Sequence, residues 1–168
     1  MLGIKGAVAV VTGAAQGNGR SIALGLAEAG ARVVVCDLQE QACSDVASEI
    51  SAAGGEAIAL GLDVARRASC EALAQETESR FGAPTDILVN NAGIIRRTPP
   101  DAESFEDDWD AMMRVNATGC MNMVRAFLPQ LKRTKGRIVN LGSIMSVSGG
   151  PGLVAYAASK GAVLQMTR

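Results

Sequence analysis

The sequence predicts one α/β domain over residues 1–168, with a doubly wound parallel sheet between two layers of helices. Two observations carry this prediction. Runs of Val, Ala and Ile alternate with segments of helical periodicity, and Gly, Asp or Asn marks each change. Buried strands that alternate with helices of about 10 to 15 residues are typical of βαβ units with right-handed crossovers. No linker, repeat or low-complexity segment divides the chain, so we expect a single three-layer α/β/α domain.

The first two expected strands, Ala7–Val11 and Arg32–Cys36, are continuous apolar runs, as in strands buried on both faces of a parallel sheet. Three further strands are expected at Ala57–Leu62, Asp86–Val89 and Arg137–Leu141. Because these runs are separated by helical segments, each strand should join its neighbour in parallel.

The helices between the strands are predicted from their periodicity and from the glycines that end the first three. They are expected at Ser21–Ala29, Gln39–Ala53, Ser69–Phe81, Phe105–Leu131 and Val154–Arg168. The long fourth helix is expected to be interrupted near Asn116.

Composition excludes several classes of function. The net charge is −1, which gives no basic surface for nucleic acid or a membrane. No apolar run reaches the roughly 18 residues of a membrane span, and the N-terminus lacks the pattern of a signal peptide. The chain has no histidine and its four cysteines are scattered, so a Ser-His-Asp triad and the usual zinc sites are excluded. We expect a cytoplasmic protein with reduced thiols and no metal.

A glycine-rich loop follows the first strand, in the order Thr12-Gly13-x-x-x-Gly17-x-Gly19. Between a strand and a helix, one glycine permits a tight turn, one lets the backbone approach a pyrophosphate and one packs the helix closely. Free N–H groups at the helix start would then face the phosphates. The alternative is a turn that only needs glycine. We interpret the loop as part of a Rossmann-like dinucleotide-binding fold.

Polar residues follow three other strands at their carboxyl ends, where open α/β sheets bind ligands. Asp37 could accept both ribose hydroxyls of an adenosine and would repel a 2′-phosphate, which favours NAD over NADP. The alternative is an N-cap for the helix that begins near Gln39. Asp63 could accept from an adenine amino group, and the loop Asn90-Asn-Ala-Gly93 ends the fourth strand. As an alternative, Asp and Asn are ordinary loop formers.

Tyr156 and Lys160 are four residues apart, so they share one face of the predicted last helix. A positive ammonium beside a phenol stabilises the phenolate, which makes the pair suited to general acid/base chemistry on a hydroxyl or carbonyl group. Ser143, at the end of the preceding strand, could hydrogen-bond the same oxygen. The alternative is a chance pairing on an amphipathic helix.

Taken together, the glycine loop, Asn90-Asn-Ala-Gly93, Asn116, Ser143 and Tyr156-x-x-x-Lys160 resemble the short-chain dehydrogenase/reductase family over the whole chain. The resemblance implies that Tyr156 is the acid/base and that Lys160 lowers the energy of the phenolate and binds the nicotinamide ribose. It also implies that Ser143 orients the substrate oxygen and that Asn116 holds a water in a proton relay. Hydride would pass between the substrate carbon and the nicotinamide.

The resemblance also implies a set of NAD contacts, which come from the strand ends, the glycine loop and the last helix. These are Gly13, Gln16, Gly17, Asn18, Gly19, Asp37, Leu38, Asp63, Val64, Asn90, Ala92, Gly93, Tyr156 and Lys160. Asn18 departs from the family, which usually has an aliphatic residue there, so its side chain is expected against the cofactor or in a local cap.

The expected function is an NAD-dependent oxidoreductase for a small-molecule secondary alcohol or ketone. Gly93-Ile-Ile-Arg-Arg97 is similar to sugar and sugar-acid dehydrogenases, which favours a sugar, polyol or sugar acid, and Arg96-Arg97 could face an anionic substrate. The first alternative is a 3-oxoacyl thioester reductase of the same family, which NADP preference would favour. The second is a truncated, catalytically inactive NAD-binding fragment.

Family members continue beyond the position that corresponds to Arg168, with further strands and helices. The family sheet order then leaves the strand Arg137–Leu141 as an exposed edge, which invites pairing with another chain. The last two long helices form the dimer seam in relatives. We therefore expect a homo-oligomer, a dimer or tetramer, and no stable, fully active monomer of this length.

Overall fold

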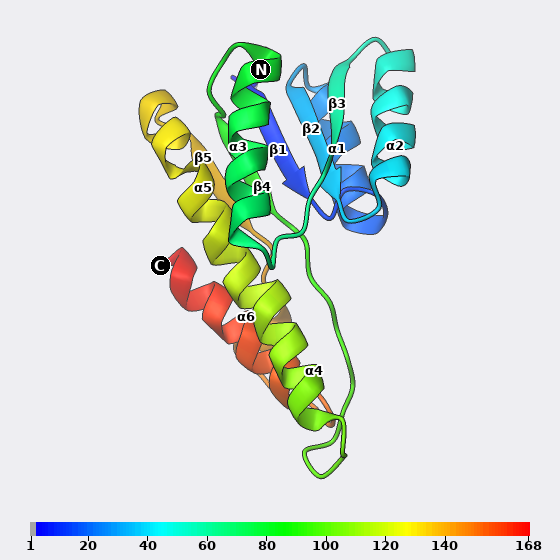
Figure 1. Cartoon of the computed structure of the whole chain (residues 1–168), viewed down its shortest axis with the longest axis vertical. Helices are drawn as coiled ribbons and strands as arrows, with labels where there is room; N and C mark the ends of the chain where they lie inside the picture. The colour runs from blue at the N-terminus through cyan, green and yellow to red at the C-terminus, as the bar shows by residue number, and fades with distance from the viewer. Residues whose placement is uncertain (1–2) are drawn as a thin grey trace.

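The computed structural model describes residues 3–168 and contains a five-stranded parallel sheet (Figure 1). The strand order is β3-β2-β1-β4-β5, so the direction in which strands are added reverses between β1 and β4. The strands are β1 (Val8–Thr12), β2 (Arg32–Asp37), β3 (Glu56–Gly61), β4 (Ile87–Asn90) and β5 (Arg137–Asn140). All five expected strands are therefore present, each within two residues of its expected bounds.

The helices connect successive parallel strands as the sequence predicts. They are α1 (Gly17–Glu28), α2 (Glu40–Ala52), α3 (Arg67–Phe81), α4 (Phe105–Met112), the π-helix η1 (Met113–Thr118), α5 (Gly119–Thr134), the short 3-10 helix η2 (Ile144–Ser146) and α6 (Val154–Thr167). Helix α1 begins four residues before the expected start, because Gly17, Asn18 and Gly19 already belong to its first turn.

Side chains of β1 alternate between two apolar cores, one on each face of the sheet. Ala9 and Val11 pack with α1 and α2, through residues such as Ile50. Val10 packs on the opposite face with α3 and α5, where Phe127 is fully buried. The period of two along a strand gives this alternation, and the expected three-layer α/β/α arrangement is confirmed.

The expected interruption near Asn116 is a widened helical turn, not a break. Helices α4, η1 and α5 run end to end as one long rod along the molecule (Figure 1). The amide of Gly119 donates to the carbonyl of Arg114, five residues earlier, which is the π-helical pattern. Such a turn holds one extra residue without ending the helix, so the backbone of η1 stays paired while Asn116 is directed into the protein.

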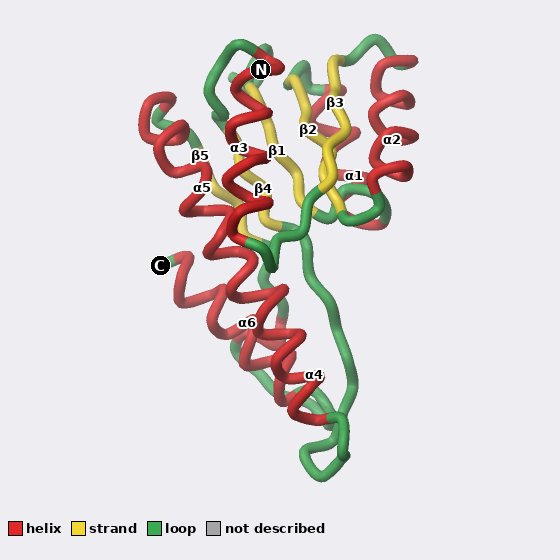
Figure 2. The backbone as a smooth tube through the Cα atoms, viewed as in Figure 1, coloured by secondary structure: helices red, strands yellow, loops and turns green. Residues whose placement is uncertain are grey.

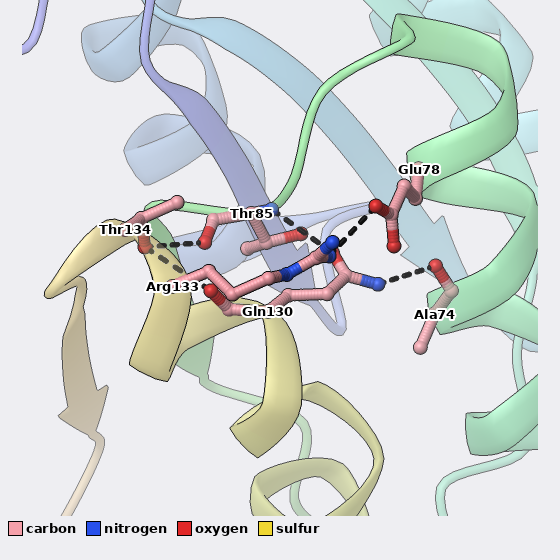
Figure 3. A network of polar contacts seen from close by, with 6 residues as sticks. All are labelled: Ala74, Glu78, Thr85, Gln130, Arg133 and Thr134. Atoms are coloured by element: carbon pink, nitrogen blue, oxygen red, sulfur yellow. Dashed lines mark hydrogen bonds and ion pairs between the residues drawn. The ribbon is translucent and has the colours of Figure 1, made fainter.

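A buried glutamine joins α5 to α3 and to the segment before β4 (Figure 3). The side chain of Gln130 accepts from the amide of Thr85 at 2.9 Å and donates to the carbonyl of Ala74 at 2.8 Å. Thr134 donates to the carbonyl of Thr85, and Arg133 forms an exposed ion pair with Glu78. Because Gln130 is 5% exposed, its two hydrogen bonds satisfy buried backbone groups that water does not reach.

Strand β5 lies at one edge of this sheet and is largely exposed. It pairs with β4 on one side, and the side chains of Ile138 and Val139 are both exposed. The edge position that the sequence predicted for this strand is confirmed for the described residues 3–168.

Candidate active site

A cleft of about 590 Å³ opens at the carboxyl ends of the strands, beside the point where the strand order reverses. Twelve of the predicted residues line it: Gly13, Gln16, Asn18, Gly19, Asp37, Leu38, Asp63, Val64, Ala92, Gly93, Tyr156 and Lys160. The cleft therefore joins the glycine loop at one end to the tyrosine and lysine of α6 at the other. Four predicted residues, Gly17, Asn90, Asn116 and Ser143, do not line it.

The glycine loop turns tightly against the end of β4. Gly13 has a φ of +64°, and a Cβ there would lie 2.9 Å from the Cα of Ala92. At Gly19, a Cβ would overlap the carbonyl oxygen of Gly13 and lie 2.7 Å from its carbon. Only glycine lets the first turn of α1 approach the loop this closely, so the two positions have the packing roles that the sequence predicts.

Hydrogen bonds hold the glycine loop to the Asn90–Gly93 segment. The hydroxyl of Thr12 accepts from the amides of Asn91 and Ala92, both at 3.0 Å. The side chain of Asn91 donates to the carbonyls of Thr12 and Gly13, at 2.9 and 3.1 Å. Asn91 thus fixes one wall of the cleft against the other.

Asp37 lies at the end of β2 with both of its carboxylate oxygens toward backbone amides. It accepts from the amide of Gln39 at 3.2 Å and, more weakly, from that of Ala15 at 3.4 Å. The N-cap of α2 is Gln39, with no side-chain capping hydrogen bond, so the alternative that Asp37 is the N-cap is wrong, and Asp37 lines the cleft. Asp63 accepts from the amide of Ala65 at 3.0 Å and lines the cleft as well. Both carboxylates are half-buried and keep acceptor capacity for a ligand.

Lys160 is buried between α6 and the end of β5. Its ammonium donates to the carbonyl of Leu141 at 2.6 Å, and the residue is 6% exposed. Burial lowers the pKa of Lys160 from its ordinary value, since water no longer stabilises the charged form, and the nearby Cys120 thiol acts in the opposite direction. Tyr156, one turn earlier on α6, is half-buried and lines the same cleft.

Asn116 is buried in η1 and uses its side chain within the protein. Its amide nitrogen donates to the carbonyl of Ile94 and to the hydroxyl of Ser159, both at 2.9 Å, and its oxygen accepts from the amide of Ile94 at 2.8 Å. Ser159 in turn donates to the carbonyl of Tyr156 at 2.8 Å. Asn116 therefore links the loop after β4 to α6.

A small cavity adjoins the cleft, between η1, α5 and α6. Its volume is about 10 Å³, and its walls include Asn90, Asn116, Cys120 and Lys160. The side-chain oxygen of Asn90 is buried without a hydrogen-bond partner, while its nitrogen donates to Asn140 at 2.8 Å. A buried acceptor beside a cavity of this size is typical of a site for one water molecule.

Ser143 begins the short helix η2 and caps it. Its hydroxyl accepts from the amide of Met145 at 3.2 Å, and its own amide donates to the hydroxyl of Ser146 at 3.1 Å. Its neighbours Leu141 and Gly142 line the cleft, but Ser143 does not. The role in substrate orientation that the resemblance implies stays a prediction.

The structure adds residues to the cleft that the sequence reasoning did not assign as cofactor contacts: Gln39, Leu62, Asn91, Ile94, Ile95, Val115, Leu141 and Gly142. Most of them are next to a predicted residue, so the strand ends themselves were the available signal. Arg96 and Arg97 do not line the cleft, and Arg96 is paired with Asp108.

Within residues 3–168 there is no group of three or more His, Cys, Asp or Glu that could hold a metal ion. No described helix is long and apolar enough to span a membrane.

The fold and this cleft define a dinucleotide-binding α/β domain with a Tyr-x-x-x-Lys pair at its site. A family model described as "short chain dehydrogenase" matches residues 7–168. The chain belongs to the short-chain dehydrogenase/reductase family, as the sequence predicted.

Named relatives and a solved structure agree with this assignment. A 3-oxoacyl-[acyl-carrier-protein] reductase of Synechocystis is 39% identical over 100% of this chain and 68% of its own length. The corresponding reductase of Thermotoga maritima is 34% identical over 98% of this chain and 67% of its own length. A short-chain dehydrogenase/reductase of Burkholderia phymatum, solved in complex with NAD, superposes with a TM-score of 0.93 at 36% identity. That superposition covers 99% of this chain and 59% of the other, so the chain spans about three fifths to two thirds of these proteins.

Proposed function

We propose that this chain binds NAD in the 590 Å³ cleft and serves hydride transfer between the nicotinamide and the carbon of a secondary alcohol or ketone. The observation that carries the proposal is the continuity of the cleft, which places the glycine loop and the Tyr156–Lys160 pair in one space. An NAD-bound structure of a family member with the same fold supports it. When bound, the cofactor supplies the hydride chemistry.

The residues of the cleft fit a dinucleotide by their chemistry. The close approach that Gly13 and Gly19 permit leaves room for a pyrophosphate against the first turn of α1, where free N–H groups favour an anion. Asp37 has acceptors suited to the ribose hydroxyls of an adenosine, and its negative charge disfavours a 2′-phosphate. Gln16, Asn18, Leu38 and Val64 line the same space.

At the other end of the cleft, Tyr156 is proposed as the acid/base that exchanges a proton with the substrate oxygen. The buried ammonium of Lys160 stabilises the phenolate and orients the nicotinamide ribose. Lys160 has three donors, and one is used by the carbonyl of Leu141. A second N–H donor of Lys160 could reach a water in the 10 Å³ cavity, and that water could donate to the unpaired side-chain oxygen of Asn90. With Asn116 in the wall, that water would supply the relay that the family resemblance implies.

For the substrate, we propose a 3-oxoacyl thioester as the first class to test, because the similar relatives from Synechocystis and Thermotoga are named for that activity. The expected sugar, polyol or sugar-acid substrate has no support from these comparisons. The paired Arg96, which lies outside the cleft lining, also removes one reason for an anionic sugar acid. A catalytically inactive NAD-binding chain is the remaining alternative, and substrate turnover distinguishes it.

We further propose that the chain self-associates, because β5 presents an unpaired edge and exposed apolar side chains. Light scattering at several protein concentrations tests the association. A concentration-independent monomer with full turnover contradicts self-association.

A cytoplasmic location is proposed from the four free, buried cysteines, which suit a reducing compartment.

The proposed cofactor is tested by titrating the protein with NADH and NADPH, followed by energy transfer from Trp109 or by calorimetry. We expect saturable NADH binding, and NADPH binding weaker by about tenfold or more. The variant D37S removes the carboxylate and should narrow the difference between the two cofactors. The variant D45N, an exposed carboxylate on α2 outside the cleft, is the charge-matched control. No binding of either cofactor, or an unchanged preference in D37S, contradicts the assignment.

A further inference from the structure

The connection between β4 and α4 forms a wall of the cleft although it has no regular secondary structure. Residues 91–104 leave the sheet and run along the molecule to the far end of α4 (Figure 2). Their first part, through Ile94 and Ile95, lines the cleft. A segment without ladder or helical hydrogen bonds keeps a defined position only where side chains from other elements hold it.

Asp108 on α4 provides one such anchor. Its carboxylate accepts from the guanidinium of Arg96 at 2.5 Å and, on its second oxygen, from the hydroxyl of Thr98. These two hydrogen bonds hold the pKa of Asp108 below its usual range. Both oxygens are thus engaged by residues ten and twelve positions earlier in the chain, so the carboxylate joins α4 to the part of the connection that follows the cleft-lining Ile94 and Ile95.

Thr98 passes this connection on to the segment that precedes α6. Its amide donates to the carbonyl of Gly152 at 2.9 Å, and Thr98 is 7% exposed. Gly152 has a φ of +69°, and a Cβ at this position would lie 3.5 Å from the amide nitrogen of Thr98. Helix α6 begins two residues later, at Val154, and carries Tyr156.

We propose that Asp108 is a positioning residue, which fixes the wall segment Ile94–Thr98, of which Ile94 and Ile95 line the cleft, and, through Thr98 and Gly152, the start of α6. This inference rests on the proposed function, because Tyr156 and Ile94 matter as parts of a cofactor and substrate cleft. Asn116 holds the wall at Ile94 and Asp108 holds it at Thr98. Both anchors belong to the same continuous rod, α4–η1, so the rod sets the distance between the wall and α6.

The test is hydrogen–deuterium exchange on the whole chain, read for residues 94–98, 150–157 and the strands β1 to β3. T98V removes the hydroxyl donor while it keeps the side-chain volume, T98S restores the donor, and D108N removes the charge. D107N, which changes the exposed neighbouring carboxylate and breaks no side-chain hydrogen bond within residues 3–168, is the control. We expect exchange of both segments to rise about tenfold or more in T98V and D108N, to stay near wild type in T98S and D107N, and to be unchanged in β1 to β3.

Equal exchange in T98V and T98S would overturn the proposal, as would a rise confined to residues 94–98 or one spread over the whole sheet. NADH titration of the same variants supplies the second readout, in which T98V should bind several-fold more weakly than T98S. Absence of NADH binding by the wild-type protein would contradict the proposed function alone, because the exchange experiment needs no cofactor. Identical NADH affinity in T98V and T98S would count against a role of Asp108 in the cleft.

Discussion

A comparison of G19A with G25A tests whether glycine at position 19 is needed for the close approach of α1 to the glycine loop. Both residues belong to α1, but Gly25 is exposed and a Cβ there meets nothing within 4 Å. At Gly19, a Cβ overlaps the Gly13 carbonyl and lies 2.5 Å from the side-chain nitrogen of Asn91. The backbone of the loop or of the first turn of α1 must therefore move to accept one methyl group.

The steric cost of the added methyl group differs between the two positions. In a helix interior, alanine is favoured over glycine by about 1 kcal/mol, so G25A should be stabilising by up to that amount. Forcing a methyl group into a packed site costs typically about 1–3 kcal/mol, so G19A should be destabilised despite the gain in helix propensity. Because the gain in helix propensity is common to both variants, we expect their free energies of unfolding to differ by roughly 1–3 kcal/mol.

Urea unfolding followed by circular dichroism measures this difference, and NADH titration measures its effect on the site. G19A should lose NADH affinity by an order of magnitude or more, because the displaced Gly13 carbonyl and Asn91 side chain lie at the cleft wall. G25A should bind as the wild type does. If G19A were as stable as G25A and bound NADH equally well, close backbone approach would not explain the glycine at this position.

Three further predictions concern single hydrogen-bond or charge effects. Q130L should lower the free energy of unfolding by about 1–3 kcal/mol, because the buried amide of Thr85 loses its acceptor. R133Q breaks only an exposed ion pair and should change the free energy of unfolding by less than about 1 kcal/mol. Equal effects of the two variants in urea unfolding would contradict this prediction. T12V should lose about 1–3 kcal/mol and T12S should recover most of it, and a T12S variant as unstable as T12V would show that the hydroxyl is not responsible. The pKa of Lys160 is lowered in the folded state, so the unfolded chain binds more protons at a pH between the folded pKa and the ordinary pKa of 10.5. The contribution of Lys160 to the free energy of unfolding should therefore rise with pH through that window. K160M should flatten that rise relative to wild type, and parallel pH profiles of the two proteins would refute it.

The strands and their order along the chain could be predicted because parallel strands that are buried on both faces appear in the sequence as continuous apolar runs. Val8–Thr12 and the centre of β2 are fully buried, as such runs require. The start of α1 was predicted too late, because Gly17 and Gly19 have low helix propensity and the sequence pattern favours a loop. Packing against Gly13 and Asn91 overrides that propensity.

The sequence could predict which residues share one space where they follow buried strands or share one helix face, as for Gly13, Gly19, Asp37 and the Tyr156–Lys160 pair. The structure brings these residues to one cleft, and their roles there stay predictions. The site was not predictable where a side chain satisfies backbone groups far away in the sequence. The hydrogen bonds of the Asn116 side chain with Ile94 and Ser159 are an example, while its expected role in holding a water stays a prediction. No spacing rule connects such residues, because their partners lie in loops whose path only the folded chain defines.

The wide turn of η1 keeps the two ends of the rod in phase although the chain holds one residue more there. A π turn takes about one residue more per 360° than an α turn, so Met113–Thr118 accommodates the extra residue without rotating α4 against α5. Phe127 and Leu131 fix the orientation of α5 on the sheet, and through η1 they also fix that of α4 and of Asp108. If the same residues formed ordinary α turns, α4 would be rotated by about 100°, and the Asp108 carboxylate would face away from Arg96 and Thr98.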